Sequence, residues 1–374
     1  MKNLLPGIAL LLLSKISFCQ QAYWQQQVNY DISVTLDTAA NTLDGSVKME
    51  YYNNSPDTLH FIWIHLWPNA YKNDRTAFSE QQLQIGNTGF YFSNSEERGY
   101  INRLNFTVDN ISAATTDHPQ HQDIVKLLLP HPLIPNGKIN IQTAFHVKLP
   151  KQFSRSGVVE NSYQITQWYP KPAVYDKKGW HEMPYLELGE FYSEFGNFTV
   201  DISAPEDLII AASGEKTRET ISNNIKTTTY TLNNTHDFAW FASKDFLVQQ
   251  DTLQLPSKLI NVFAYYYKKD EKIWQNSIRY IKRAILSKSG WLGEYPYNNV
   301  SVVAKKGSSD GGMEYPTITL VSTPENEKHL DFLINHEVGH NWFYAIIGSN
   351  ERAFPWMDEG MNTYYDNRYL DQYY

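Results

Sequence analysis

The residues of this sequence best suited to bind a metal and activate water lie in one short segment, His336-Glu337-Val338-Gly339-His340. On a helix, residues four apart share a face, so the imidazoles of His336 and His340 can reach one ion. Paired histidine nitrogens of this kind bind Zn²⁺ at about 2.0–2.1 Å. Glu337 lies beside them, where its carboxylate can take a proton from a zinc-bound water and pass it to a leaving amine. The alternative is an ordinary helix with two surface histidines.

A third metal ligand is available further along the chain, at Glu359. Eighteen residues separate it from His340, and Asp358 directly precedes it. A set of two histidines and one glutamate leaves one coordination position open, which is typical of catalytic rather than structural zinc. A glutamate occupies any one specified position in only about one case in sixteen. The joint spacing therefore favours one catalytic Zn²⁺. Asp358 could orient a zinc-binding histidine, or stabilise the start of the helix that carries Glu359.

Composition limits which other chemistry and partners are open to the chain. Its 374 residues include one cysteine, which excludes a disulfide framework and any multi-cysteine metal site. Imidazoles and carboxylates must therefore hold any metal. The 32 Lys and Arg residues against 40 Asp and Glu give a net charge of -8 without a long basic run, so no nucleic-acid partner is expected.

The first 20 residues are typical of a secretory signal peptide. Lys2 precedes an apolar run, 4–13, that is too short to span a bilayer. We therefore expect an exported protein that is periplasmic, outer-membrane-associated or secreted. Cys19 stands where a lipoprotein carries its lipid anchor, although Phe18 before it is bulkier than the usual small residue. No later run of eighteen apolar residues occurs, so no transmembrane segment is expected.

The elements that must position the candidate zinc ligands differ between the two parts of the chain. Residues 21–255 are expected to form an antiparallel β domain of saddle or sandwich type, because alternating apolar and polar residues recur between turn signals. The clearest predicted strands are 30–37, 46–52, 59–66, 139–148, 197–203, 208–212, 226–232 and 259–267. Residues 256–374 are expected to form an incomplete α+β domain, so the fold class is multidomain.

Helices are expected to carry the zinc-binding residues of the second domain. Apolar spacing predicts a helix over 271–287 that ends at Ser289-Gly290, with short strands at 300–304 and 317–322 following it. Thr323-Pro324-Glu325 is a typical helix start, and the helix is predicted to run through the zinc motif to Ile347. A further helix is expected over 357–370.

These motifs together resemble the gluzincin metallopeptidases, and specifically the aminopeptidase N family. That family pairs His-Glu-x-x-His with a glutamate eighteen residues later, and it has a Gly-x-Met-Glu-Asn strand upstream. Here residues 311–315 read Gly-Gly-Met-Glu-Tyr, and Glu314 lies 22 residues before His336. Gln-Trp-Tyr-Pro at 167–170 and Asp-Phe-Ala-Trp at 237–240 resemble the N-terminal β domain of bacterial members. The resemblance covers about residues 25–374.

The resemblance implies roles for particular residues of a thermolysin-like zinc peptidase domain. It implies one Zn²⁺ with the ligands His336, His340 and Glu359, and Glu337 as the general base. It implies a peptide-binding set of Gly311, Gly312, Met313, Glu314 and Gln167. Within that set, Glu314 would bind the free ammonium group of a peptide, and the glycines would let its backbone lie close. The alternative for 311–315 is a glycine-rich turn into an ordinary strand.

Three departures from the family pattern leave the specificity open. Tyr315 replaces the asparagine of the upstream strand. If Gln167 is the family glutamine, Tyr169 replaces a glutamate or glutamine that is a second contact to the amine. The sequence also ends fifteen residues after Glu359, before the family's oxyanion-stabilising tyrosine and the helical half of its catalytic lobe. We therefore expect a fragment of a longer protein.

The expected function is that of an exported zinc metallopeptidase that hydrolyses peptide bonds and removes N-terminal residues from peptides. One alternative is an endopeptidase with altered specificity. The other is a non-catalytic exported binding or scaffold protein that retains the family fold. A scaffold has no need of Glu337, which favours the enzyme.

Overall fold

The structure is a computed structural model that describes residues 23–307 and 311–374. The predicted signal peptide, 1–20, and Cys19 lie outside the described residues. Within the described residues, no helix combines the length and the apolar character needed to cross a membrane.

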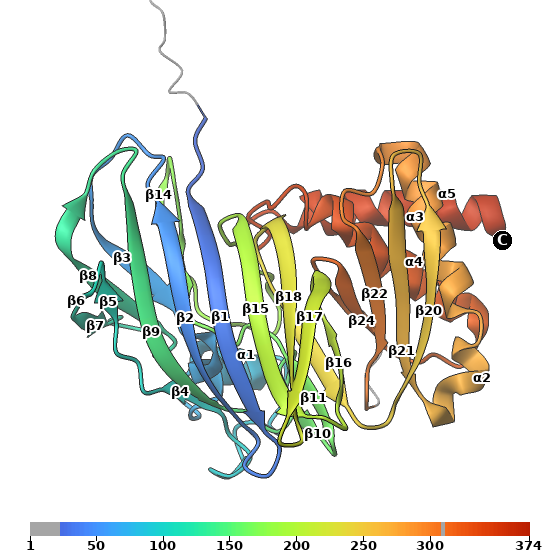
Figure 1. Ribbon diagram of the computed structural model, residues 1–374, viewed down its shortest axis with the longest axis horizontal. Coiled ribbons are helices and arrows are strands. Elements are labelled where there is room, and N and C mark those ends of the chain that lie inside the picture. Colours follow the sequence, from blue (N-terminus) through green and yellow to red (C-terminus); the bar gives the residue numbers. More distant parts are fainter. Residues whose placement is uncertain (1–22, 308–310) are drawn as a thin grey trace, which may run out of the picture.

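A nine-stranded sheet dominates the N-terminal part of the chain (Figure 1). Its order is β17-β18-β15-β1-β2-β9-β5-β6, with β4 also paired to β9. All its pairs are antiparallel except β1 with β15, where Tyr30 lies opposite Phe198. The strands are β1 Gln27–Asp37, β2 Thr42–Tyr52, β4 Tyr100–Asn102, β5 Thr107–Val108, β6 Ile111–Ser112, β9 Lys138–Lys148, β15 Gly196–Pro205, β17 Glu215–Ser222 and β18 Ile225–Thr235.

Three smaller antiparallel sheets accompany this large sheet, and side chains of β1, β3, β11 and β19 meet in one apolar core. Alternate residues of β1 are buried, as the period-two pattern predicted. The smaller sheets contain β3 Leu59–His65, β7 Thr115–Asp117, β8 Ile124–Leu133 and β12 Lys171–Pro172; β10 Gly157–Val159, β11 Ser162–Ile165, β16 Ile209–Ala212 and β19 Trp240–Ser243; and β13 Val174–Asp176 with β14 Gly179–His181. The helical elements of this part are η1 Trp67–Tyr71 and α1 Ala77–Gln84.

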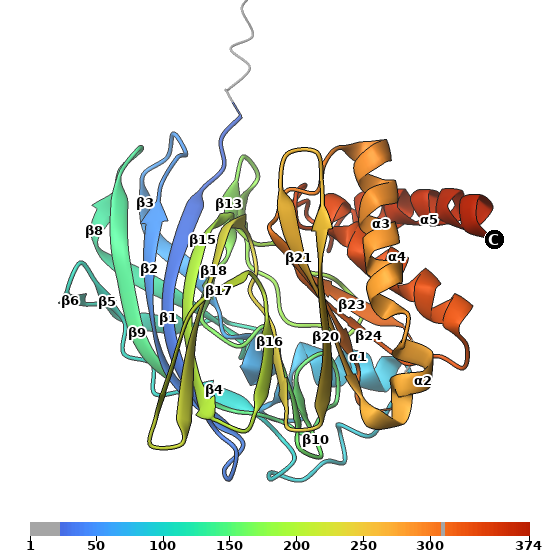
Figure 2. The same ribbon diagram turned by 45° about the vertical axis from the view of Figure 1, so that its right-hand side comes forward.

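The C-terminal part is a five-stranded mixed sheet whose helices gather on one side (Figure 2). Its order is β20-β21-β22-β24-β23, with a parallel centre and antiparallel edges. The strands are β20 Phe246–Gln254, β21 Leu259–Tyr267, β22 Asn299–Ala304, β23 Gly312–Tyr315 and β24 Ile318–Val321. The helices are η2 Lys268–Asp270, α2 Glu271–Trp274, α3 Ser277–Leu292, α4 Glu327–Phe343, η3 Pro355–Met357 and α5 Glu359–Tyr373. Because β20 belongs to this sheet, the expected division at residue 255 falls inside the β20–β21 hairpin.

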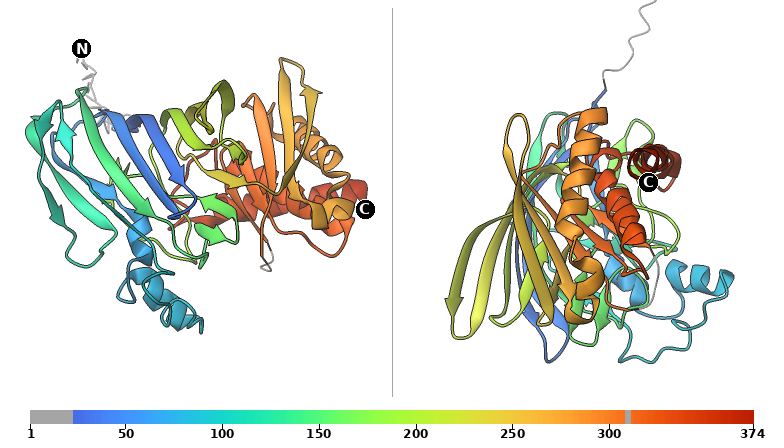
Figure 3. Two further views of the ribbon diagram at one scale, coloured as in Figure 1. Left: turned by 60° about the horizontal axis from the view of Figure 1, so that its bottom comes forward. Right: turned by 90° about the vertical axis from the view of Figure 1, so that its right-hand side faces the viewer.

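The two parts share apolar packing although their main sheets lie at opposite ends of the molecule (Figure 3). The core under the five-stranded sheet also contains Trp67, Phe78 and Phe191 from the N-terminal part. Segments that connect strands of the large sheet therefore pack against the sheet and helices that hold the candidate zinc ligands.

Helix ends differ from the sequence predictions because local caps decide them. Helix α4 begins at Glu327 rather than at Thr323, since the Asn326 side chain accepts a hydrogen bond from the His329 amide at 2.9 Å. It ends at Phe343 rather than at Ile347. The predicted helix over 271–287 is two helices, α2 and α3. Helix α3 continues past Gly290 and stops only at Gly293, whose φ of +123° breaks the helix.

Candidate zinc site and substrate cleft

Two helices bring the three predicted zinc ligands together. His336 and His340 lie one turn apart on α4, and their Nε2 atoms are 3.2 Å from each other. Glu359, at the start of α5, places Oε2 3.4 Å from His336 Nε2 and 3.9 Å from His340 Nε2. All three ligand atoms lie within 4.8 Å of one another.

A carboxylate behind each histidine fixes the orientation of its ring. Asp366 Oδ2 is 2.6 Å from His336 Nδ1, and Asp358 Oδ1 is 2.5 Å from His340 Nδ1. Because a carboxylate can only accept, each Nδ1 donates, so in the neutral rings each Nε2 turns a lone pair toward the other. Asp358 was a candidate for this role in the sequence, but Asp366 was missed. Its spacing of seven residues from Glu359, two turns along one face of α5, was the available signal.

This arrangement fits a zinc ion. Two nitrogens bound to one tetrahedral ion at 2.0–2.1 Å lie about 3.3 Å apart, close to the observed separation of the histidine nitrogens. Two facing lone pairs repel unless a cation lies between them. Burial alone would lower the pKa of His336, but its bonds to Asp366 and Glu359 raise it to about 10. The surroundings thus favour positive charge at this point, which a divalent cation would supply.

Glu337 lies next to the candidate metal position and is almost completely buried. Thr319 Oγ1 donates to its Oε2 at 3.4 Å, and 4% of the residue is exposed. Burial raises the pKa of Glu337 to about 7, against the opposing influence of His336 and His340. A carboxyl group with such a pKa can both accept and return a proton near neutral pH.

Two glycines allow this packing. A Cβ on Gly312 would collide with the Glu337 side chain, so this exposed glycine leaves room for the general-base candidate. Gly311, with a φ of +94°, faces open space. A Cβ on Gly339 would collide with Asn362 of α5 and Lys288 of α3. Gly339 therefore permits the close helix packing that positions Glu359.

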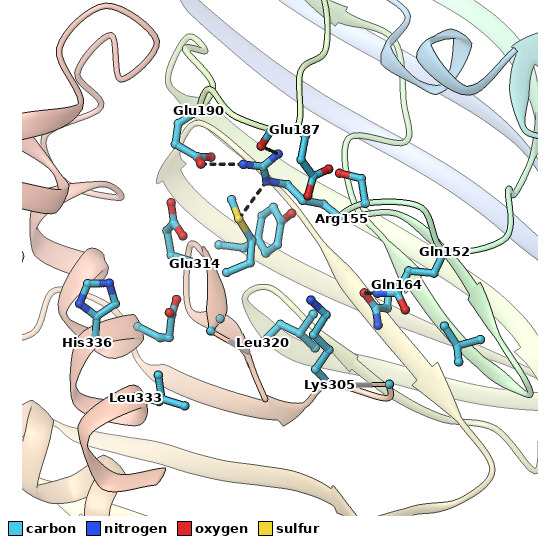
Figure 4. A pocket seen from close by; sticks show the side chains of 18 of the residues that line it. Gln152, Arg155, Gln164, Glu187, Glu190, Lys305, Glu314, Leu320, Leu333 and His336 are labelled. Atoms are coloured by element: carbon cyan, nitrogen blue, oxygen red, sulfur yellow. Dashed lines mark hydrogen bonds and ion pairs between the residues drawn. The ribbon is translucent and has the colours of Figure 1, made fainter. Parts of the chain in front are cut away.

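A cleft of about 980 Å³ opens beside Glu337 (Figure 4). Gly311, Gly312, Met313 and Glu314 of the predicted peptide-binding set line it, together with His336 and Glu359. Glu314 is 5% exposed, and its Oε1 has no hydrogen-bond partner among the described residues. Burial, together with the nearby charges of Glu190 and Asp358, raises the pKa of Glu314 well above its usual range. A bound cation would relieve this cost.

Gln167, the remaining member of that set, is not among the residues that line the cleft. It is buried, and its Nε2 donates to Asp237 Oδ2 at 2.6 Å. Tyr169 also donates to Asp237, at 3.2 Å, so neither side chain reaches the cleft as an amine contact. Gln164, three residues earlier, lines the cleft instead and accepts a hydrogen bond from Gln152 at 2.8 Å.

The sequence matches no known protein-family profile, and no curated protein matches it. The fold is similar to those of solved M1 zinc metallopeptidases. A two-domain M1 zinc metallopeptidase mutant bound to L-tryptophan has a TM-score of 0.62 at 16% identity, with 93% of this chain and 72% of that chain covered. The M1 zinc metallopeptidase of Deinococcus radiodurans has a TM-score of 0.59 at 15% identity, with 93% and 70% covered. This likeness shows the fold: the chain has the mixed, sheet-rich, multidomain architecture of M1 zinc metallopeptidases. The narrower resemblance to the aminopeptidase N family rests on sequence motifs.

Proposed function

We propose that this protein is an exported zinc peptidase that binds one Zn²⁺ and removes N-terminal residues from peptides. The observation that carries the proposal is the buried Glu337 beside two orientated histidines, on the wall of a cleft large enough for a peptide. The solved proteins that share this fold are zinc metallopeptidases, and one from Deinococcus radiodurans is described as a mutant bound to a Tyr-Ser-Ala substrate. Export rests on residues 1–20 of the sequence.

Each residue of the site would have a separate role in peptide hydrolysis. Zinc, held by His336, His340 and Glu359, would polarise the scissile carbonyl and lower the pKa of water to about 7. Glu337 would accept the proton of the attacking water and return it to the leaving amine. Glu314 would accept hydrogen bonds from the ammonium group of the peptide, and so place the first peptide bond beside Glu337.

The position of Tyr169 favours a second candidate, an endopeptidase. If no side chain takes over the amine contact that Tyr169 fails to make, Glu314 alone must select free N-termini. A scaffold protein is the less supported alternative, because it would gain nothing from a buried Glu337 that only raises the cost of folding.

One experiment separates these candidates. The zinc-loaded protein is given a peptide with a free amine and the same peptide N-acetylated, and hydrolysis is followed by chromatography. We expect the free peptide to be preferred, and Glu337→Gln to retain zinc but slow hydrolysis by about 10²-fold or more. Equal cleavage of both peptides would support the endopeptidase. Cleavage of neither would support the scaffold.

A further inference from the structure

One wall of the cleft carries carboxylate oxygens that no other described residue uses. Glu187 and Glu190 both line the cleft, and the Oε2 atom of each is buried without a hydrogen-bond partner. The Oε1 atom of Glu314, on the neighbouring strand β23, is also buried without a hydrogen-bond partner among the described residues. Figure 4 shows these three side chains in one region of the cleft, beyond His336. Buried carboxylates without donors are costly, so their presence points to a cationic ligand.

Two arginines hold this wall in place. Arg155 donates to two backbone carbonyls of the wall at 2.9 and 3.1 Å, and to Glu190 Oε1 at 2.6 Å. Arg352 donates to three carbonyls of residues 184–190, at 3.1 to 3.3 Å. The Glu190 carboxylate and the backbone that carries Glu187 are therefore held in position before any ligand arrives.

Carboxylates gather at this end of the cleft. Glu187, Glu190 and Glu314 line it, and Arg155 pairs with only one oxygen of Glu190. The ammonium group of a peptide would be received by Glu314. The Oε2 atoms of Glu187 and Glu190 would then remain for a second positive charge on the same peptide.

We propose that this wall selects peptides whose first residue is lysine or arginine, with the side-chain cation received by Glu187 and Glu190. The inference rests on the proposed function, since it assigns the ammonium group to Glu314. A basic side chain would donate to the Oε2 atoms that are otherwise unpaired. A neutral side chain would offer no donor to these oxygens, which disfavours it.

Citrulline tests this selectivity because it has the shape of arginine without the charge. We expect the zinc-loaded protein to hydrolyse arginine arylamide with a kcat/KM about tenfold or more above that for citrulline arylamide. Glu187→Gln should bring the ratio close to one, and its melting temperature should stay unchanged because the Glu187 carboxylate bonds no other described residue. Glu160→Gln is the matched control. Glu160 lines the same cleft but pairs with Lys306 and is largely exposed, so the ratio should persist. Equal rates for the two substrates would overturn the inference.

A binding measurement separates failure of the inference from failure of the proposed function. If neither arylamide is hydrolysed, the aminopeptidase proposal fails, and calorimetry with L-argininamide and L-citrullinamide decides the selectivity. A Kd about tenfold lower for argininamide, with the difference lost in Glu187→Gln, would support the inference. Equal Kd values for both amides would overturn it even if the protein is an active peptidase.

Discussion

Two polar clusters of this molecule differ in how their charged groups are paired. The closed cluster, Gln167, Tyr169, Lys171 and Asp237, lies in the N-terminal part. There Asp237 accepts from Lys171 at 2.7 Å and from the Phe238 amide at 2.8 Å, besides Gln167 and Tyr169. The open cluster, His336, Glu337, His340, Glu314 and Glu359, lies beside the cleft.

The difference lies in whether the oxygen and nitrogen lone pairs have donors. In the closed cluster both oxygens of Asp237 are used, so nothing is left to bind a ligand. In the open cluster the Nε2 atoms of two histidines face each other, and Glu314 keeps an oxygen without a partner among the described residues. A cluster whose lone pairs are satisfied internally stabilises the fold, whereas one that needs an added cation binds ligands. Substitutions in the two clusters should therefore fail in different ways.

The largest effect expected is loss of the metal from the open cluster. His340→Ala removes one of three ligands, so zinc affinity should fall by about 10³-fold or more while the protein remains folded. Zinc content after dialysis and circular dichroism measure the two properties. His329→Ala is the matched control, because this exposed histidine on the same helix belongs to no group of potential metal ligands among the described residues. Full zinc content in the His340 variant would remove the open cluster from consideration as a metal site.

The closed cluster should respond in stability instead. Asp237→Ala leaves the buried Lys171 without its partner, and breaking a buried pair in this way costs about 3–5 kcal/mol. Urea unfolding measures the change. The control is Asp207→Ala, which breaks the exposed pair with Lys244 and should cost less than about 1 kcal/mol. If Asp237→Ala lowered the free energy of unfolding no more than the control does, the closed cluster would not be important for the stability of the fold.

His236, next to the closed cluster, makes that region sensitive to acid. It is buried, bonded to the Tyr344 carbonyl at 3.1 Å, and burial lowers its pKa from 6.5 to about 4. Between pH 6.5 and pH 4, His236 is protonated in the unfolded chain but stays neutral in the folded chain. Stability is therefore lost as the pH falls from about 6.5 to 4, by up to about 3 kcal/mol.

Urea unfolding at pH 7 and pH 4.5 tests this prediction. Wild type should lose more stability between the two pH values than His236→Gln, which can still donate to the Tyr344 carbonyl. The same pH-dependent loss in both proteins would assign the acid sensitivity to other groups.

A smaller effect should come from the contact between Gly312 and Glu337. In Gly312→Ala the new methyl group must displace the Glu337 side chain, so turnover should fall by about 10²-fold with zinc retained. Gly290→Ala is the control, since a Cβ there meets no neighbouring atom within 4 Å. Unchanged turnover in Gly312→Ala would mean that Glu337 acts from more than one position.

The sequence by itself determined the features that depend on local geometry. Four residues make about one helical turn, so His336 and His340 had to share a face wherever the helix lay, and alternation predicted strands such as 259–267. Helix ends were predicted less well, because a single cap such as Asn326 outweighs a longer pattern.

Only the tertiary structure decided which distant residues complete each cluster. Asp366 accepts a hydrogen bond from His336, and Gln167 donates to Asp237 rather than lining the cleft. The Glu337 side chain occupies the space beside Gly312. Each of these pairings joins residues 25 or more positions apart in the sequence. Their distances depend on how sheets and helices pack, and no local period of the chain encodes that packing. For the same reason, the unpaired oxygens of Glu187 and Glu190 could be recognised only after Arg155 and Arg352 had been placed against them.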